Sequence, residues 1–185
     1  MNGLFRAARQ LQEFCDARGW RSCFIGGLAV QRWGQPRLTV DVDLTLLAGF
    51  GNEAAFVDPL LAAYEGRIPD ARDFALRHRV LLLRSAGGAG IDISLGALPF
   101  EESVVRRATT ASFGPEMDLR TCSAEDLVVL KLFAWRLLDR HDAEGVAIRQ
   151  KGKLDWTYME EQLRPLSEVK EQPEMMDTLA RLRQL

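Results

Sequence analysis

The chain has 185 residues, of which 47% are hydrophobic and 27% are charged, and its formal net charge at pH 7 is -2. This composition is too apolar for a disordered protein and is typical of a folded globular one. The net charge excludes a protein that coats nucleic acid through its overall charge, but it does not exclude local basic patches. The length suits one α/β domain with a helical extension and excludes two independent enzymes.

Targeting signals and cysteine chemistry give little indication of function. No apolar run approaches the roughly 20 residues of a membrane span, and charges interrupt any N-terminal signal core. We therefore expect a cytoplasmic protein without a membrane partner. Cys15, Cys23 and Cys122 are odd in number and form no C-x-x-C pair, so neither a disulfide framework nor a zinc site is indicated. We interpret all three as small apolar residues.

The first half of the chain alternates helical and strand patterns. Apolar residues at helical spacing predict a helix over residues 3–17, which ends before Gly19. A short strand at 22–25 then leads into Gly26 and Gly27. Further helices are expected over residues 28–33, 53–64 and 100–108. Strands 79–84 and 90–95 are expected to form a hairpin around a turn at 86–89. Residues 109–121 are expected to form either a hairpin or an irregular crossing.

Residues 38–46 have the most regular strand pattern, a strict alternation of polar and apolar side chains. Alternation places successive side chains on opposite faces of a strand. The expected core face carries Val40, Val42, Leu44 and Leu46, and the other face carries Thr39, Asp41, Asp43 and Thr45. One face is thus predicted to be core and the other to be an acidic site.

From residue 123 onward the sequence becomes helical. Ser123 followed by Glu125 and Asp126 begins a helix that is predicted to reach Leu138. Further helices are expected over residues 142–150, 155–163 and 173–182. This composition shift predicts an α/β core over residues 1–121 and a helical C-terminal region over 122–185 packed on it. The predicted fold class is α+β, with a mixed sheet backed by helices.

The pair Asp41 and Asp43 indicates chemistry. Carboxylates two residues apart on a strand project from one face with Cα atoms roughly 6.5 to 7 Å apart, close enough to share a hard cation such as Mg²⁺ or Mn²⁺. Gly26 and Gly27, between a strand and a short helix, would let backbone N–H groups approach a triphosphate. Either feature alone is also typical of an ordinary turn or a solvated strand face. Together, with Arg37 leading into the second strand, they favour phosphoryl transfer.

The segment FIGGLAVQRWGQPRLTVDVDL, residues 24–44, resembles nucleotidyltransferases of the polymerase-beta-type fold. It is most similar to AbiEii-like toxins and related minimal nucleotidyltransferases. In that resemblance Gly26 and Gly27 stand at the family's Gly-Ser or Gly-Gly, and Asp41 and Asp43 stand at its metal-binding Asp-x-Asp. Gly27 lacks the hydroxyl that some members aim at phosphate, but its backbone donor remains.

The resemblance also implies a third carboxylate on a later strand. Asp92 fits, because residues 90–95 alternate with Asp92 opposite their apolar side chains. We predict Asp92 to be the third metal ligand or the general base. A polar residue on an exposed strand face is the alternative, and Asp70, Asp73 and Asp118, in expected loops, are weaker competitors.

The segment EDLVVLKLFAWRLLDRHD, residues 125–142, is similar to an AbiEii-like helix that carries a Lys and, after an Arg, two acids three residues apart. On that basis the nucleotide-binding candidates are Lys131, Arg136, Asp139 and Asp142, together with Gly26, Gly27 and Arg37. On a helical projection Lys131 lies between Leu127 and Leu138 on a largely apolar face, so it needs a partner such as a triphosphate or Asp139. A Lys that extends to solvent is the alternative.

The resemblance implies a metal-dependent nucleotidyltransferase that moves a nucleoside monophosphate from a nucleoside triphosphate to a hydroxyl. Its catalytic residues would be Asp41, Asp43, Asp92 and Lys131, with the three acids as ligands of Mg²⁺ or Mn²⁺. The acceptor would be an RNA end such as that of a tRNA, a protein or a small molecule, and a toxin of this type would have a cognate antitoxin as partner.

Five arginines lie in and around the segment that leads to Asp92, namely Arg67, Arg72, Arg77, Arg79 and Arg84. They suit the phosphates of an RNA acceptor, and they equally suit a solubilising surface. Two other functions stay open, a non-catalytic nucleotide-binding or antitoxin-like regulatory subunit and a metal-dependent phosphohydrolase. The three acids speak against the first, and the scarcity of histidines, His78 and His141 alone, speaks against the second.

Overall fold

A computed structural model describes residues 3–185 of the chain. Over these residues the backbone forms a seven-stranded sheet and nine helices. Close contacts divide the chain into two compact units. The sheet unit comprises Met1–Leu28 and Leu38–Cys122, and the helical unit comprises Ala29–Arg37 and Ser123–Leu185. No helix within residues 3–185 has both the length and the apolar character to cross a membrane.

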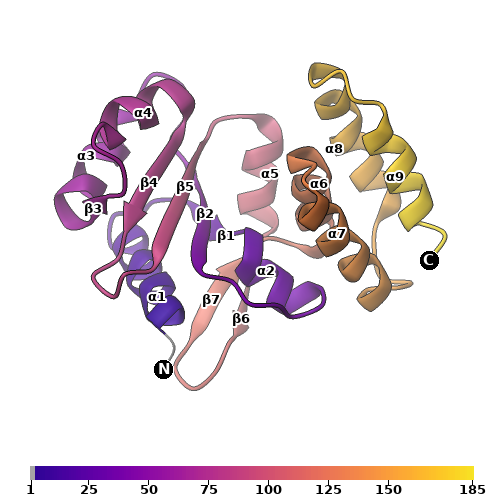
Figure 1. Ribbon diagram of the computed structural model, residues 1–185, viewed down its shortest axis with the longest axis horizontal. Helices are drawn as coiled ribbons and strands as arrows, with labels where there is room; N and C mark the ends of the chain where they lie inside the picture. Colours follow the sequence, from indigo (N-terminus) through magenta and orange to yellow (C-terminus); the bar gives the residue numbers. More distant parts are fainter. Residues whose placement is uncertain (1–2) are drawn as a thin grey trace. The chain divides into compact units, whose positions relative to one another are not determined.

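The sheet is mixed, with strand order β3-β4-β5-β2-β1-β7-β6. Strand β2 runs parallel to β5 and β1 parallel to β7, while the other neighbours are antiparallel. The β4–β5 hairpin is the one predicted, and β6–β7 confirms the hairpin alternative for residues 109–121 (Figure 1). The strands are β1 (Ser22–Phe24), β2 (Asp41–Leu47), β3 (Glu65–Gly66), β4 (Val80–Arg84), β5 (Gly90–Gly96), β6 (Thr109–Ser112) and β7 (Asp118–Thr121).

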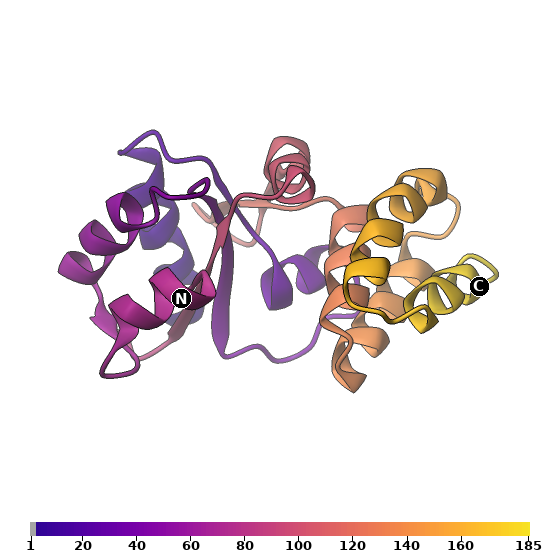
Figure 2. The same ribbon diagram turned by 90° about the horizontal axis from the view of Figure 1, so that it is seen from above.

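Helices cover both faces of this sheet. Figure 2 shows α1, α3 and α4 on one face and α5 on the other. These helices are α1 (Gly3–Asp16), α3 (Ala54–Ala63), α4 (Ala71–His78) and α5 (Pro99–Arg107). The main core lies under the first three and includes Leu11, Val57, Leu60 and Ala75 from the helices and Leu44, Leu81, Ile91 and Ile93 from the strands. Because side chains alternate along a strand, the polar residues between these apolar ones face the other way.

Three expectations for the sheet unit were wrong. The strand predicted from residue 38 begins at Asp41, and Val40, expected in the core, is 65% exposed. The reason is that β5 begins at Gly90 opposite Asp41, so it offers no partner to residues 38–40. Helix α4 and the short strand β3 were missed, and Asp73 and Asp118 lie in α4 and β7 and not in loops.

The helical unit contains α6 (Ala124–Ala134), α7 (Leu137–Arg149), α8 (Trp156–Val169) and α9 (Glu174–Leu182). Helix α2 (Gly26–Trp33) begins in the sheet unit and ends in the helical unit. Helix α6 contacts each of α7, α8 and α9 and thus forms the centre of the unit. Its core includes Leu127, Val128, Leu132, Ala143, Val146, Met159, Leu163 and Met175.

The single helix predicted over residues 123–138 is wrong. Trp135 adopts a left-handed conformation with φ 65° and ends α6, its N–H donating to the Lys131 carbonyl at 3.1 Å. Helix α7 then starts at Leu137 and absorbs the helix expected over 142–150. Left-handed ends usually carry Gly or Asn, so a Trp there gave no signal. Leu138, expected beside Lys131, is 50% exposed on the next helix.

Candidate active site

Three predicted carboxylates meet on one face of the sheet. In the parallel pairing of β2 with β5, Asp43 lies opposite Asp92 and Asp41 lies opposite Gly90. Neighbouring strands lie about 4.8 Å apart, so paired residues have their side chains side by side. Val42 and Ile91, which alternate with these acids, are fully buried on the opposite face. We call Asp41, Asp43 and Asp92 the acidic face.

The start of α2 adjoins the acidic face through two glycines. Gly26 has φ 54°, and a Cβ on it would lie 2.0 Å from the Asp43 Oδ2 atom. The Gly27 N–H donates to the same oxygen at 3.3 Å. Position 26 therefore requires glycine both for its backbone conformation and for space. The Gly-Gly pair and Asp43 of the Asp-x-Asp pair are therefore in direct contact.

Gly27 is required for a different reason, which involves Thr39. A Cβ on Gly27 would lie 2.3 Å from Thr39 Oγ1 and 2.6 Å from Thr39 Cβ. The Thr39 hydroxyl donates to the Asp41 carbonyl at 3.2 Å, which ties it to the start of β2. A serine would not fit at position 27 unless Thr39 moved.

Sequence reasoning missed that Arg67 and Gly90 belong to this site. The Arg67 guanidinium lies 2.6 Å from Asp92 Oδ1 and 3.5 Å from Asp41 Oδ1. A Cβ on Gly90 would lie 2.1 Å from Asp41 Oδ1 and 2.6 Å from Arg67 Nη1, so the glycine makes room for this ion pair. The only signals were the arginine-rich segment and the Gly-x-Asp spacing of residues 90–92, and neither specifies a contact.

Of the other four arginines, Arg84 lies on the same side of the sheet as Asp41, because both pair with Gly90. Arg72 pairs with the exposed Asp58, 2.7 Å away. Arg79 donates hydrogen bonds to Glu53 and to two backbone carbonyls, so it connects separate segments within the sheet unit. Arg77 and Arg84 are exposed. Of the five arginines, Arg67 is the one with an ion pair to the acidic face among the described residues.

The electrostatics of the acidic face suit a divalent cation. Burial raises the pKa of Asp92, and the neighbouring Asp41 carboxylate raises it further, while Arg67 opposes both. Crowded carboxylates of this kind are hard oxygen donors whose charge a cation would neutralise. Among residues 3–185 no group of three or more His, Cys, Asp or Glu is arranged as a metal cage. Mg²⁺ needs no such cage, because it is usually held by one or two carboxylates together with substrate phosphates and water.

The remaining predicted residues form a buried charge cluster in the helical unit. Lys131, 6% exposed, donates to Asp139 and Asp142, each at 2.8 Å. Arg37 donates two hydrogen bonds of 2.8 Å to Asp142, and Arg136 forms an ion pair with Asp139 at 2.6 Å. The expectation that Asp139 is a partner of Lys131 is confirmed, and the solvent-exposed alternative is wrong. The cluster joins α6, α7 and the residues that follow α2.

The cluster also shifts the acidity of its carboxylates. Burial alone would raise the pKa of Asp139, but hydrogen bonds from Arg136 and Lys131 outweigh it and leave the pKa below its ordinary value. Asp142 behaves in the same way, with Arg37 and Lys131 as its donors. Both acids are therefore ionised in the folded protein at neutral pH.

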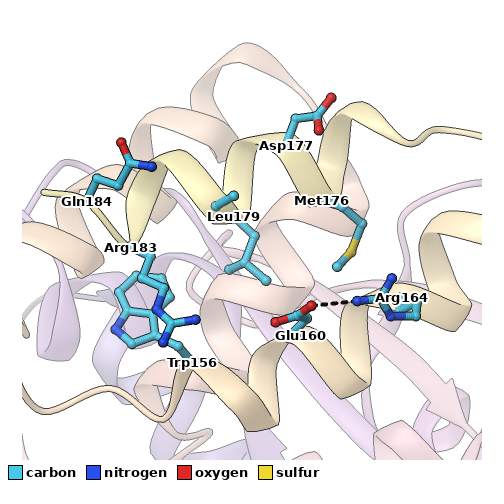
Figure 3. Close-up of a pocket in the computed structure, with 9 residues that line it drawn as sticks. Trp156, Glu160, Arg164, Met176, Asp177, Leu179, Arg183 and Gln184 are labelled. Carbon is cyan, nitrogen blue, oxygen red and sulfur yellow. Dashed lines mark hydrogen bonds and ion pairs between the residues drawn. The ribbon is translucent and has the colours of Figure 1, made fainter.

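A cavity of about 340 Å³ lies between α8 and α9 within the helical unit. Figure 3 shows Trp156 and Arg183 near one end and Met176 near the other, with the Glu160–Arg164 ion pair along α8. None of the predicted site residues lines this cavity. It therefore has no part in the site described above.

Comparisons with known proteins give a family from the sequence and a fold from the structure. The family model described as "Nucleotidyl transferase AbiEii toxin, Type IV TA system" matches residues 17–150. Among solved structures, an antigenic nucleotidyltransferase-like protein from Paracoccidioides brasiliensis is 15% identical with a TM-score of 0.52, over 95% of this chain and 91% of that one. The antibiotic-resistance factor ANT(2'')-Ia is 15% identical with a TM-score of 0.50, over 97% of this chain and 88% of that one. No curated protein matches the sequence significantly. The structural similarity confirms the predicted fold class.

Proposed function

Because the chain belongs to the AbiEii nucleotidyltransferase toxin family, we propose that it transfers a nucleoside monophosphate to a hydroxyl acceptor, using Mg²⁺ or Mn²⁺ at Asp41 and Asp43. The resemblance inferred from residues 24–44 and 125–142 is thereby confirmed. The observation that carries the finer proposal is the pairing of β2 with β5, which sets three carboxylates beside the glycine-rich start of α2. We further propose that the chain acts as a toxin with a cognate antitoxin.

The proposed reaction joins the acceptor oxygen to the α-phosphorus of the triphosphate. The bond from that phosphorus to the bridging oxygen breaks, and pyrophosphate leaves. A bound divalent cation supplies charge neutralisation at the phosphate oxygens. Asp41 and Asp43 supply its carboxylate ligands, and Asp92 accepts the proton of the acceptor hydroxyl as general base. The raised pKa of Asp92 supports this assignment, since a base of higher pKa holds a proton better.

For the helical unit, taken by itself, we propose that Arg37 and Arg136 are the side chains that bind phosphate groups. The side chains of Arg37 and Arg136 are 29% and 78% exposed, whereas Lys131 is buried and its ammonium group forms ion pairs with two acids. We therefore assign Lys131, Asp139 and Asp142 the role of positioning these two guanidinium groups. A guanidinium held by a carboxylate on one edge can still donate to phosphate from another.

Metal binding at the acidic face is tested by thermal unfolding. Mg²⁺ or Mn²⁺ at about one hundred times its dissociation constant should stabilise the parent by about 2.7 kcal/mol. Replacing Asp41 and Asp43 together by Asn should abolish this shift, because the carboxylate ligands are gone. Asp58→Asn removes an exposed acid elsewhere in the sheet unit and should leave the shift intact. A shift of parental size in the double variant would refute the metal site.

For the acceptor we propose an RNA end, on the strength of exposed arginines in the sheet unit. Arg77 and Arg84 are exposed, so their charges are accessible to phosphates. RNA labelling should therefore fall steeply as salt rises. Replacing both by Gln should flatten the slope of log affinity against log salt by about 0.7 per lost contact. Arg72→Gln, which removes an arginine already paired with Asp58, is the control, and an unchanged slope in the double variant would favour a protein or small-molecule acceptor.

A further inference from the structure

Arg67 is fixed to the sheet by its backbone. Its N–H donates to the Leu82 carbonyl at 2.9 Å, which extends the β3–β4 pairing one residue beyond Gly66. Leu82 pairs with Asp92 on β5, and Asp92 pairs with Asp43 on β2. Arg67 thus begins a row across four strands that ends at the proposed metal ligands. The row places its side chain on the acidic face, since paired residues share a face of the sheet.

The Arg67 guanidinium bridges acids on two neighbouring strands. Nη2 lies 2.6 Å from Asp92 Oδ1, and Nη1 lies 3.5 Å from Asp41 Oδ1. Only a glycine at position 90 leaves space for Nη1 and for the Asp41 carboxylate, because a Cβ there would overlap both. The Arg67 and Asp92 side chains are 27% and 32% exposed, so their pair is partly shielded from water, whereas Asp41 is 44% exposed and forms the longer and weaker pair.

The net charge of the acidic face matches the charge of one divalent cation. Three carboxylates and one guanidinium carry a formal charge of -2, which a single Mg²⁺ or Mn²⁺ balances. In the structure the guanidinium lies beside Asp41, whose carboxylate the proposed function assigns to the cation. Two cationic groups at one carboxylate repel each other.

We propose that Arg67 is the resident counterion of the acidic face, a positioning residue that competes with the divalent cation for Asp41. This inference rests on the proposed function. Without cation, Arg67 holds Asp41 and Asp92 in place against their mutual repulsion. Cation binding displaces the guanidinium from Asp41, which leaves Arg67 free to donate to an anionic phosphate of the bound triphosphate. Arg67 thereby weakens binding of the cation alone and favours its binding together with the triphosphate.

The test measures Mn²⁺ affinity by calorimetry, without nucleotide and without transfer. Arg67→Met keeps the length of the side chain and removes its charge, so it should tighten Mn²⁺ binding tenfold or more and lower the melting temperature of the cation-free protein. Arg67→Lys keeps the charge and should stay within about threefold of the parent dissociation constant. Arg72→Met removes an arginine paired with Asp58 and should change neither quantity. Arg67→Gln replaces the Met variant should the latter fail to fold.

The outcomes separate this inference from the proposed function. If the parent binds Mn²⁺ and the uncharged Arg67 variants bind it equally or more weakly, Arg67 is only a structural partner of the acids and the inference is overturned. If neither the parent nor any variant binds Mn²⁺ with or without triphosphate, the proposed metal site itself is overturned. Tightening confined to the uncharged variants, with the Lys variant like the parent, supports competition by charge.

Discussion

Lys131→Met is expected to lower the free energy of unfolding by about 3 kcal/mol, the lower end of the range for breaking a buried ion pair. The substitution keeps the length and the apolar stem of the side chain, so the loss reports the ammonium alone. Asp139 and Asp142 are 1% and 4% exposed and would each lose one of their cations. Arg136 and Arg37 remain as partners, which is why we expect the lower end of the range.

For a chain of this length the loss corresponds to a fall in melting temperature of roughly 6 to 12 °C. Lys153→Met is the matched control, because Lys153 is exposed and its loss should change stability by less than about 0.5 kcal/mol. Denaturant unfolding of the three proteins at pH 7 measures both effects. A Lys131→Met protein as stable as the control would mean that the Lys131 ammonium contributes nothing to folding.

The same cluster gives the stability a defined dependence on pH. Folding lowers the pKa values of Asp139 and Asp142. Their contribution to the free energy of unfolding is therefore complete above the pKa of the unfolded chain, about 3.9, and is lost as pH falls through their pKa values in the folded protein. Once both acids are protonated, Lys131 has no charge to pair with. The stability gap between the parent and Lys131→Met should therefore narrow as pH falls below about 4, and a constant gap would assign the loss to packing.

The second large effect is expected at Asp92. Asp92→Asn keeps the shape of the side chain and removes the proposed base, so it should lower kcat for transfer by about 10² to 10⁴. Because Asp41 and Asp43 remain, the Asp92→Asn protein should still bind Mn²⁺, although more weakly than the parent because the acidic face has lost one negative charge. Steady-state kinetics and calorimetry on the same preparation measure the two quantities. Ser94→Ala alters the next residue of β5 on the same face and serves as the control.

Transfer by Asp92→Asn within tenfold of the parent would remove Asp92 from the chemistry. Complete loss of Mn²⁺ binding together with transfer would instead make Asp92 a metal ligand. That second result would contradict the assignment of Asp92 as base, while leaving the acidic face as the site.

Much of the acidic face was predictable from local pattern and resemblance. The alternation through Val42, Leu44 and Leu46 predicted both the strand and the face on which Asp41 and Asp43 lie, because a buried strand face has a period of two. The alternation around Ile91 and Ile93 did the same for Asp92. That β2 and β5 are parallel neighbours is not contained in either pattern, since nearly fifty residues separate them and periodicity says nothing of pairing partners. The resemblance, and not the pattern, linked Asp92 to the other two acids.

Other features depend on tertiary contacts that leave no local signal. The end of α6 at Trp135 lacks the Gly or Pro that usually marks a helix end, so Lys131 and Leu138 were expected on one helix and lie on two. Arg67 reaches Asp92 from the position just after a two-residue strand, which is too short to show alternation. Gly90 was predicted as the first residue of a strand, and its role in making room for Arg67 and Asp41 depends on which strand lies beside it.

The most direct test of the central claim is the release of pyrophosphate from each labelled nucleoside triphosphate in the presence of RNA and Mg²⁺. The parent should release pyrophosphate, and not inorganic phosphate, in step with transfer of the labelled nucleoside monophosphate to the acceptor. Chelation of the metal should stop both, and so should replacement of Asp41 and Asp43 by Asn. Release of inorganic phosphate without labelled acceptor would indicate a phosphohydrolase, and parental transfer by the Asp41→Asn, Asp43→Asn protein would contradict the account.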